Sequence, residues 1–234
     1  MEAQIRRPDG THRWLKLTAK ATGVNKRATR LSGIKQDITE QRTEWERLRR
    51  LAESDALTGV ANRARFHAEF LDLSAGSAGL GLIGALVLLD LNDLKSINDR
   101  WGHAAGDRHI AEFARRLAFA FPQASLVARI GGDEFAVIFP ARLPALSVET
   151  LVRSRMESIS SAGMIAGETV PLGFCAGMAL NQDDGVSPEA LFAAADAALY
   201  RAKRTGRTEI CVAPKACHAP GAQQPGAGEI GHSA

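Results

Sequence analysis

The chain has 234 residues, of which 45% are hydrophobic and 24% are charged, and its formal net charge is +3. This composition is typical of a soluble globular protein, and the length gives room for one well-packed domain of about 150 residues with shorter segments around it. The positive charge is small and scattered, so no binding to nucleic acid or to an anionic membrane is expected.

The cysteines and the first residues of the chain indicate the cellular compartment in which the protein is expected. Cys175, Cys211 and Cys217 are odd in number and lack metal-ligand spacing, which predicts a reducing, cytoplasmic setting. The charged start of the chain contains Pro8-Asp9-Gly10, so no secretory signal is expected there. The longest apolar run, residues 78–91, is too short and too rich in glycine to cross a bilayer, and no membrane span is expected in this chain.

The first 38 residues are predicted to form short strands. Pro8-Asp9-Gly10-Thr11 is a turn sequence, residues 12–19 alternate as a half-buried strand does, and residues 31–38 can pair with them. The segment 1–38 resembles the closing strands of a PAS sensor domain. Its matching motifs are the turn Arg6 to Gly10, the strand start Arg13-Trp14 and the closing Asp37-Ile38-Thr39-Glu40. The resemblance implies an upstream sensor or regulator and carries over no ligand.

A charged helix without Gly or Pro is predicted for residues 39–54. A narrow seam with spacings of three and four residues runs along it through Ile38, Gln41, Trp45, Leu48 and Ala52. Two interpretations are open: a linker helix that lies on its own domain, or a short parallel coiled coil that brings two copies of the next domain face to face.

The main domain is predicted to begin near Asp55 with a turn-rich entry. Asn62 can cap a helix that places Phe66 and Phe70 on one face. Residues 82–89 are apolar at nearly every position and end at an acid, Asp90, so they predict a central strand that is buried on both faces.

Further elements follow this strand. A polar passage, residues 90–107, is too dense in acids and amides for a simple loop, and it leads into a helix with an apolar face. Two apolar runs joined by Gly131-Gly132 then predict a tight β-hairpin. The remaining elements are a helix at about 147–160, a strand pair ending near Leu180, a helix from Ser187-Pro188 to Gly206 and a strand at 208–212.

This order of elements predicts an α+β fold. Strand, helix, hairpin, helix and strand form the ferredoxin-like split βαβ arrangement (βαββαβ), an antiparallel sheet with helices on one face, preceded here by the N-terminal linker helix. Residues 55–213 make up this domain, and residues 214–234, rich in Ala, Gly and Pro, predict a disordered tail. In this topology the end of the first strand lies beside the hairpin turn, so Asp90 would meet Asp133 and Glu134.

The hairpin turn carries these two adjacent acids directly after its glycines. Glycine lets a phosphate or another backbone come close, and paired carboxylates suit a divalent cation that a nucleotide also binds. A solvated hairpin tip is the alternative, which one short motif leaves open.

Several motifs in the same order resemble one family. Arg129-Ile130-Gly131-Gly132-Asp133-Glu134-Phe135 is similar to the signature of the GGDEF family, the diguanylate cyclases, whose domain is of the nucleotide-cyclase type. Its other motifs are present as Asp55 to Arg63, the first-strand acid Asp90, Lys95 to Asp99, Gly102 to Asp107 and Tyr200 to Arg207. Together with the hairpin motif they stand in the family's order within residues 55–212, which argues against a chance match.

The resemblance implies a magnesium site, in which Mn²⁺ can also serve. Asp90, the backbone carbonyl of Leu91 and Asp133 would hold the ion, and Glu134 would add a carboxylate and help to activate the attacking 3′-hydroxyl. For Asp90 the alternative is a strand-end cap, although an acid opposite two more acids is costly without a cation.

The resemblance also implies the nucleotide contacts. Asn98 and Asp107 match the pair that reads guanine and so favours GTP, and either alone would more often be a turn former or a helix cap. The triphosphate would be held by the backbone amides around Asp93 and Leu94 and by Lys203 and Arg207. Without the other motifs, the last two would be read as helix C-terminal cations.

The implied reaction condenses two GTP into cyclic di-GMP and releases two pyrophosphates. Since one domain binds one GTP and the product has two equivalent linkages, catalysis requires a homodimer. An inactive GTP-binding regulatory module and a purely structural role are the alternatives. The family's Arg-x-x-Asp product-inhibition site is replaced by Pro122-Gln123-Ala124-Ser125, so no feedback through that surface is expected.

Overall fold

The structure is a computed structural model that describes residues 1–24, 27–74, 83–165, 167–181, 186–205 and 208–214. Its internal contacts divide the chain into two units, Met1–Ser54 and Asp55–Ala234. Within the described residues, no helix combines the length and the hydrophobicity that a membrane crossing requires. The predicted tail, apart from residue 214, lies outside the described residues.

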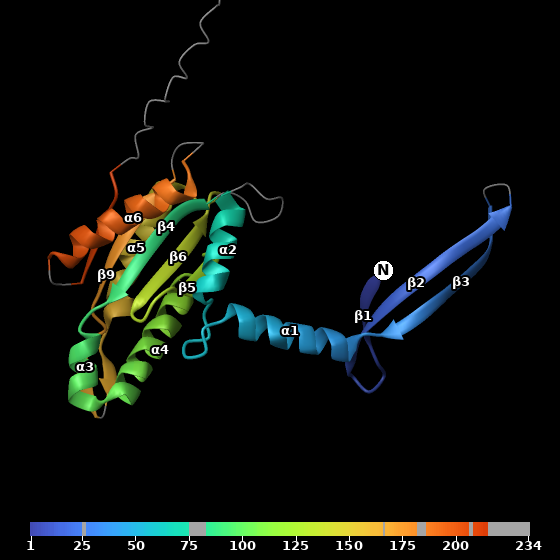
Figure 1. The fold of residues 1–234 in the computed structure, drawn as a ribbon, viewed down its shortest axis with the longest axis horizontal. Coiled ribbons are helices and arrows are strands. Elements are labelled where there is room, and N and C mark those ends of the chain that lie inside the picture. Colours follow the sequence, from blue (N-terminus) through green and yellow to red (C-terminus); the bar gives the residue numbers. More distant parts are fainter. Residues whose placement is uncertain (25–26, 75–82, 166, 182–185, 206–207, 215–234) are drawn as a thin grey trace, which may run out of the picture. The chain divides into compact units, whose positions relative to one another are not determined.

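The first unit is an antiparallel sheet followed by one helix (Figure 1). Strands β1 (Glu2–Arg6), β2 (His12–Val24) and β3 (Arg27–Asp37) pair in the order β1-β2-β3, and α1 (Thr39–Glu53) follows. The predicted turn is present, since the amide of Gly10 donates to the carbonyl of Arg7 at 2.9 Å. The likeness to a PAS domain stays a prediction.

The second unit contains a five-stranded sheet in the order β10-β9-β4-β6-β5 (Figure 1). The strands are β4 (Ile83–Leu91), β5 (Leu126–Arg129), β6 (Glu134–Pro140), β9 (Phe174–Leu180) and β10 (Glu209–Val212), and a separate hairpin pairs β7 (Gly163–Ile165) with β8 (Glu168–Val170). The helices are α2 (Arg63–Ser74), α3 (Leu94–Trp101), α4 (His103–Ala120), α5 (Ala145–Ser160) and α6 (Pro188–Lys203). The predicted α+β class and the split βαβ core, β4-α4-β5-β6-α5-β9, are confirmed.

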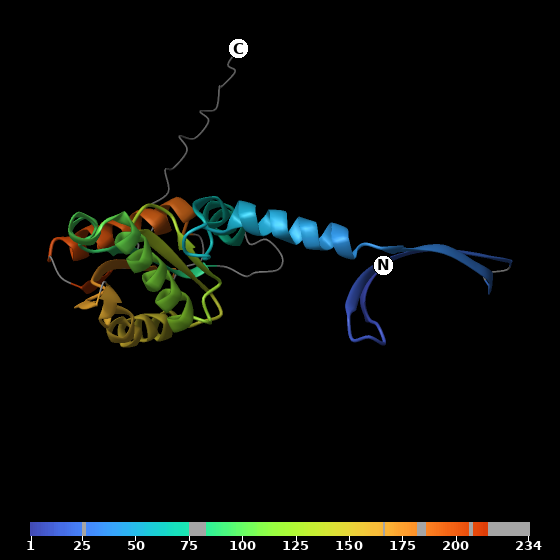
Figure 2. The same cartoon turned by 90° about the horizontal axis from the view of Figure 1, so that it is seen from below.

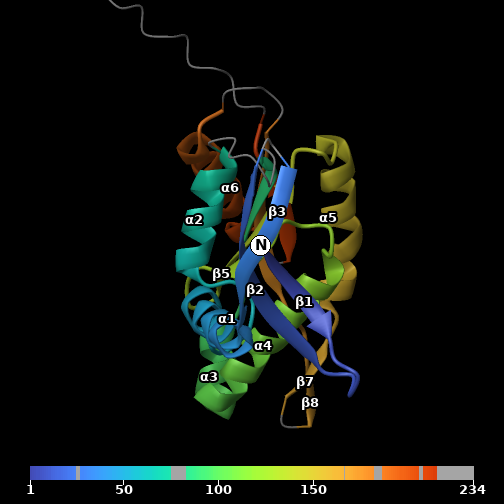
Figure 3. The ribbon, with the colours of Figure 1, turned by 90° about the vertical axis from the view of Figure 1, so that its right-hand side faces the viewer.

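Helices cover both faces of this sheet, so the expectation of helices on one face was wrong (Figures 2 and 3). Alternate residues of β4 explain the two layers, because successive strand side chains point to opposite faces. Val87 and Leu89 belong to a core cluster with residues of α4 and α5, whereas Leu86 and Leu88 belong to a second cluster with residues of α2 and α6. The second layer comes from the additions at the two ends of the split βαβ core.

The sheet is also not wholly antiparallel, because β10 pairs with β9 in parallel. This strand follows α6, which crosses the sheet and returns the chain in the direction of β9. Close packing of α6 on β9 depends on Gly177, where a Cβ would collide with the backbone of Ala195 and Leu199. The predicted helix start is confirmed, since Ser187 Oγ accepts from the amide of Ala190 at 3.2 Å.

The polar passage at residues 90–107 contains a helix that the sequence interpretation missed. Leu94–Trp101 forms α3, and α4 begins immediately afterwards at His103. The signal was a spacing of three and four residues among Leu94, Ile97 and Trp101, of which Ile97 is buried. The surrounding acids and amides masked it.

Candidate active site

The site begins where β4 ends against the hairpin turn. Asp90 lies directly opposite Glu134 of β6 and opposite Cys175 of β9 in the two antiparallel ladders. The amide of Leu91 donates to the carbonyl of Asp133 at 3.0 Å. The turn with its acids is therefore attached to the end of the central strand, as the topology predicted.

A cavity of about 390 Å³ opens at this place. It is lined by Asp90, Leu91, Asn92, Asp93, Lys95, Ser96, Asp133, Cys175 and Lys203. The wall of this cavity therefore combines residues from the end of β4, the start of α3, the hairpin turn, β9 and the end of α6. Its size falls within the range of small-ligand pockets, and its mixed charges favour a polar ligand.

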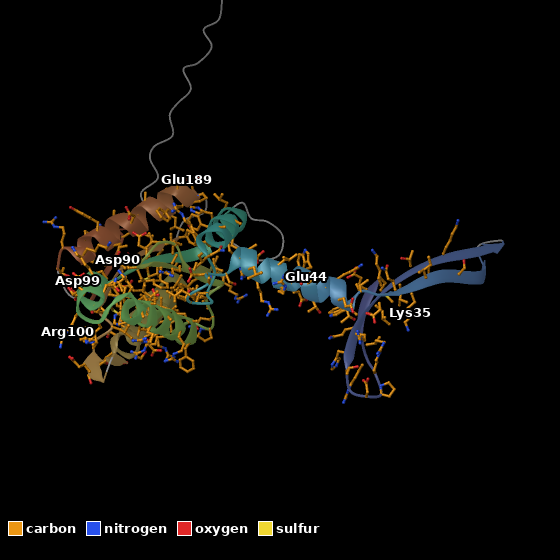
Figure 4. The ribbon with its side chains drawn as sticks, turned by 60° about the horizontal axis from the view of Figure 1, so that its bottom comes forward. Lys35, Glu44, Asp90, Asp99, Arg100 and Glu189 are labelled. Atoms are coloured by element: carbon orange, nitrogen blue, oxygen red, sulfur yellow. The ribbon has the colours of Figure 1, made fainter. Side chains whose placement is uncertain are left out.

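Of the two lysines that line this cavity, Lys203 is the one that pairs with an acid of its wall. The Nζ of Lys203 donates to Oδ2 of Asp90 at 2.6 Å. Figure 4 labels Asp90, which lies at the end of the second unit that carries α3. Burial raises the pKa of Asp90, with a contribution from Asp133, while Lys203 opposes the rise. For Lys203, burial alone would lower the pKa, but Asp90, Glu134 and Asp133 raise it overall. The ammonium therefore lies in the field of all three acids.

The donor set fits a divalent cation without forming its complete cage. Among the described residues, no group of three or more His, Cys, Asp or Glu side chains is arranged around a possible metal position. Glu134 is not part of the cavity wall, and a Cβ on Gly131 would collide with its Oε2. Asp90, Asp133 and the carbonyl of Leu91 nevertheless offer the hard oxygen ligands that Mg²⁺ prefers.

The start of α3 has the features of an anion site. Asp93, the residue before the helix, has φ 58° and is the one non-glycine residue with positive φ in the described part of the chain. This left-handed turn directs the chain from β4 into α3. The first amides of a helix have no intrahelical partner and attract anions such as phosphate. Leu94 and Lys95, the first two residues of α3, bring such amides to the cavity.

The predicted guanine-reading pair lies where α3 packs against α4. The side chain of Asn98 covers Gly106, because a Cβ on that glycine would collide with its Oδ1. Asp107 follows Gly106 directly and is exposed. Asn98 and Asp107 thus come from facing helices, although neither lines the cavity of Asp90.

One predicted residue and several residues that were not predicted remain to be placed. Arg207 lies outside the described residues. Cys175 was considered only as an unpaired cysteine, yet it stands opposite Asp90 and has its Sγ 3.5 Å from Oδ1 of Asn92. Only the register between β4 and β9 could have placed it there. Lys95 and Ser96 were also not singled out as site residues.

A second cavity, of about 470 Å³, lies along α4 and contains none of these acids. Its lining includes His109, Glu112 and Arg116 of α4. His109 is buried and its Nε2 has no hydrogen-bond partner among the described residues. Burial, with a contribution from Arg116, lowers the pKa of His109.

Comparisons with known proteins identify the class. A family model described as "Diguanylate cyclase, GGDEF domain" matches residues 52–209. The chain therefore belongs to the GGDEF family. A crystal structure of the coiled coil and GGDEF domain of DgcB from Caulobacter crescentus in complex with c-di-GMP is similar, with a TM-score of 0.65 and 33% identity, covering 75% of this chain and 93% of that one.

Curated relatives differ in the activity that their names state. Diguanylate cyclase DgcP of Pseudomonas aeruginosa is 34% identical over 184 residues, which are 79% of this chain and 27% of that protein. Cyclic di-GMP phosphodiesterase PdeR of Escherichia coli is 34% identical over 180 residues, which are 75% of this chain and 26% of that protein. The chain thus spans about a quarter of the length of these relatives.

Proposed function

We propose that this chain is a diguanylate cyclase that condenses two GTP into cyclic di-GMP with release of two pyrophosphates. The observation that carries the proposal is the convergence of Asp90 and Asp133 on one cavity, with the start of α3 and Lys203 in the same wall. Acids for a metal ion, amides for phosphate and a cation are the parts that phosphoryl transfer requires.

In the proposed mechanism each group has one task. Asp90, Asp133 and the carbonyl of Leu91 would hold Mg²⁺ or Mn²⁺, and Glu134 of the hairpin would add a further carboxylate. The bound ion supplies charge neutralisation at the phosphates and a lower pKa for the attacking 3′-hydroxyl. Glu134 accepts the proton of that hydroxyl when the carboxylate reaches it.

The nucleotide is held at both ends. The amides at the start of α3 and the ammonium of Lys203 bind the triphosphate, with Arg207 as a further candidate. Asn98 and Asp107 read the base, because an amide donates to guanine O6 and a carboxylate accepts from its N1–H and N2–H groups. This pattern selects GTP over ATP.

The reaction needs two copies of the domain, since each 3′-hydroxyl attacks the α-phosphate held by the other. The exposed apolar side chains of α1 support self-association: Trp45 is 59% exposed, Leu48 52% and Leu51 66%. Exposed apolar residues along one helix favour pairing with another helix. Control by an upstream sensor is proposed to act on this encounter.

The test is direct. The purified chain is incubated with GTP and Mg²⁺, and cyclic di-GMP is measured, with a forced-dimer version as control for a monomeric resting state. Asp133→Asn should abolish product, and Asp196→Asn on the exposed face of α6 should not. GTP binding without product would make the chain an inactive regulatory GGDEF module, and absence of GTP binding would refute both.

A further inference from the structure

The ion pair between Lys203 and Asp90 joins the last residue of α6 to the end of the central strand. The 2.6 Å contact is short for an ammonium–carboxylate hydrogen bond, and the side chain of Asp90 is only 15% exposed. A carboxylate at such a place is costly without a neighbouring cation. Lys203 supplies that cation.

The position of Lys203 coincides with the proposed function of Asp90. One oxygen of this carboxylate is occupied by the ammonium, whereas a metal ion would need the same oxygen atoms. A second cation in the cavity wall, Lys95, has no ion pair with a described residue. Of the two lysines in the cavity wall, Lys203 therefore pairs with Asp90 and Lys95 does not.

The same ammonium is proposed to bind the triphosphate. One ammonium can donate to several oxygens, but a phosphate group and a metal-bound Asp90 compete for it. A cation that leaves Asp90 for the phosphates would also remove a positive charge from the metal position. The metal ion and the nucleotide would then favour each other's binding, as linkage requires.

We propose that Lys203 is the resident cation of this site: it neutralises Asp90 while no nucleotide is bound and moves to the triphosphate when GTP enters, which leaves Asp90 to the metal ion that accompanies the nucleotide. The inference rests on the proposed function. It adds that the metal ion binds weakly to the nucleotide-free protein, so the site is completed only by the substrate.

The first experiment measures Mn²⁺ affinity of the full chain without nucleotide, from the electron paramagnetic resonance signal of free Mn²⁺. Lys203→Met should bind Mn²⁺ about fivefold more tightly than the wild type, which corresponds to the loss of one partly exposed ion pair. Lys203→Arg, which keeps the cation, should resemble the wild type. Lys95→Met should change the affinity by less than about twofold, since it removes a charge but no pair. Equal effects of Lys203→Met and Lys95→Met would overturn the proposal.

The second experiment measures GTP binding in EDTA by calorimetry. Asp90→Asn should strengthen metal-free GTP binding several-fold, because it releases the ammonium, whereas Asp133→Asn removes the same charge and should have a smaller effect. An equal gain in both variants would overturn the proposal. This arm keeps the test decisive if Lys203→Met does not fold.

The outcomes separate the inference from the proposed function. Absence of Mn²⁺ binding in the wild type and in every variant, even with GTP, would refute the metal site and the inference together. Cyclic di-GMP formation with identical Mn²⁺ affinities of the wild type and Lys203→Met would refute the inference alone.

Discussion

Arg129 links Asp55, at the start of the second unit, to the turn that carries Asp133. Its Nη1 donates to Oδ1 of Asp55 at 3.1 Å, while its Nη2 donates to the carbonyl of Gly132 at 2.7 Å. The side chains of Arg129 and Asp55 are both largely buried. The hydroxyl of Thr58 also donates to Asp55 at 2.7 Å. One guanidinium thus fixes the hairpin turn to the entry of the domain.

Arg129→Met is therefore expected to lower the free energy of unfolding by about 2 kcal/mol, because a largely buried carboxylate and a carbonyl lose a charged donor. Cyclic di-GMP formation should fall further than stability explains, since the turn is released. Arg153→Met, which breaks the exposed pair with Glu149 on α5, should cost less than about 0.5 kcal/mol. Urea unfolding and turnover measurements on both variants check this, and equal losses would contradict it.

Gly106→Ala is expected to weaken GTP binding by about tenfold to a hundredfold, because the new Cβ would displace the amide of Asn98, and such strain costs about 1–3 kcal/mol. Ala104→Ser, on the exposed side of the same helix, is the control and should leave affinity unchanged. Calorimetric titration with GTP decides the matter. Unchanged affinity in Gly106→Ala would separate Asn98 from guanine recognition.

Asp93→Gly should leave stability unchanged or raise it by up to about 1 kcal/mol, because glycine adopts φ 58° without strain. Asp99→Gly, in the interior of α3, should instead cost about 0.5–1 kcal/mol. The two substitutions remove the same side chain, and denaturant unfolding should show a loss of stability for Asp99→Gly alone. An equal loss in both variants would mean that φ at residue 93 does not limit the fold.

Trp45→Glu with Leu48→Glu is expected to make the chain monomeric and to reduce turnover at fixed protein concentration, because charges replace the exposed apolar side chains of α1. Glu46→Ala on the same helix should keep the dimer. Light scattering coupled to size exclusion, followed by the GTP assay, measures both. A dimer that survives the double substitution would place the dimer interface elsewhere.

Acid should destabilise the protein through His109. Burial lowers its pKa in the folded state, so the unfolded chain binds more protons; the stability is present above the ordinary pKa of about 6.5 and is lost as the pH falls below it. The loss of unfolding free energy between pH 7.5 and pH 5.5 should be smaller in His109→Leu than in the wild type. His103→Gln, an exposed site on the same helix, should retain the wild-type loss.

Local sequence patterns predicted most elements but not how they are layered. Glycines of the hairpin, the cap at Ser187 and the apolar run before Asp90 act over short distances, so their structures follow from nearby residues. Helix α3 was hidden because most of its residues are polar, and Ile97 is its one buried residue. The second helical layer was missed because the apolar pattern of a strand predicts that both of its faces are buried. The pattern does not identify the helices that bury them.

The sequence by itself determined the family, the order of the elements and the identity of the acids, because short contiguous motifs are enough to recognise each of these. Only the tertiary structure decided that Cys175 stands beside Asp90, that Asn98 covers Gly106 and that Lys203 holds Asp90 at 2.6 Å. These relationships depend on strand register and helix packing, which sum many small contacts between distant segments. No single motif encodes them.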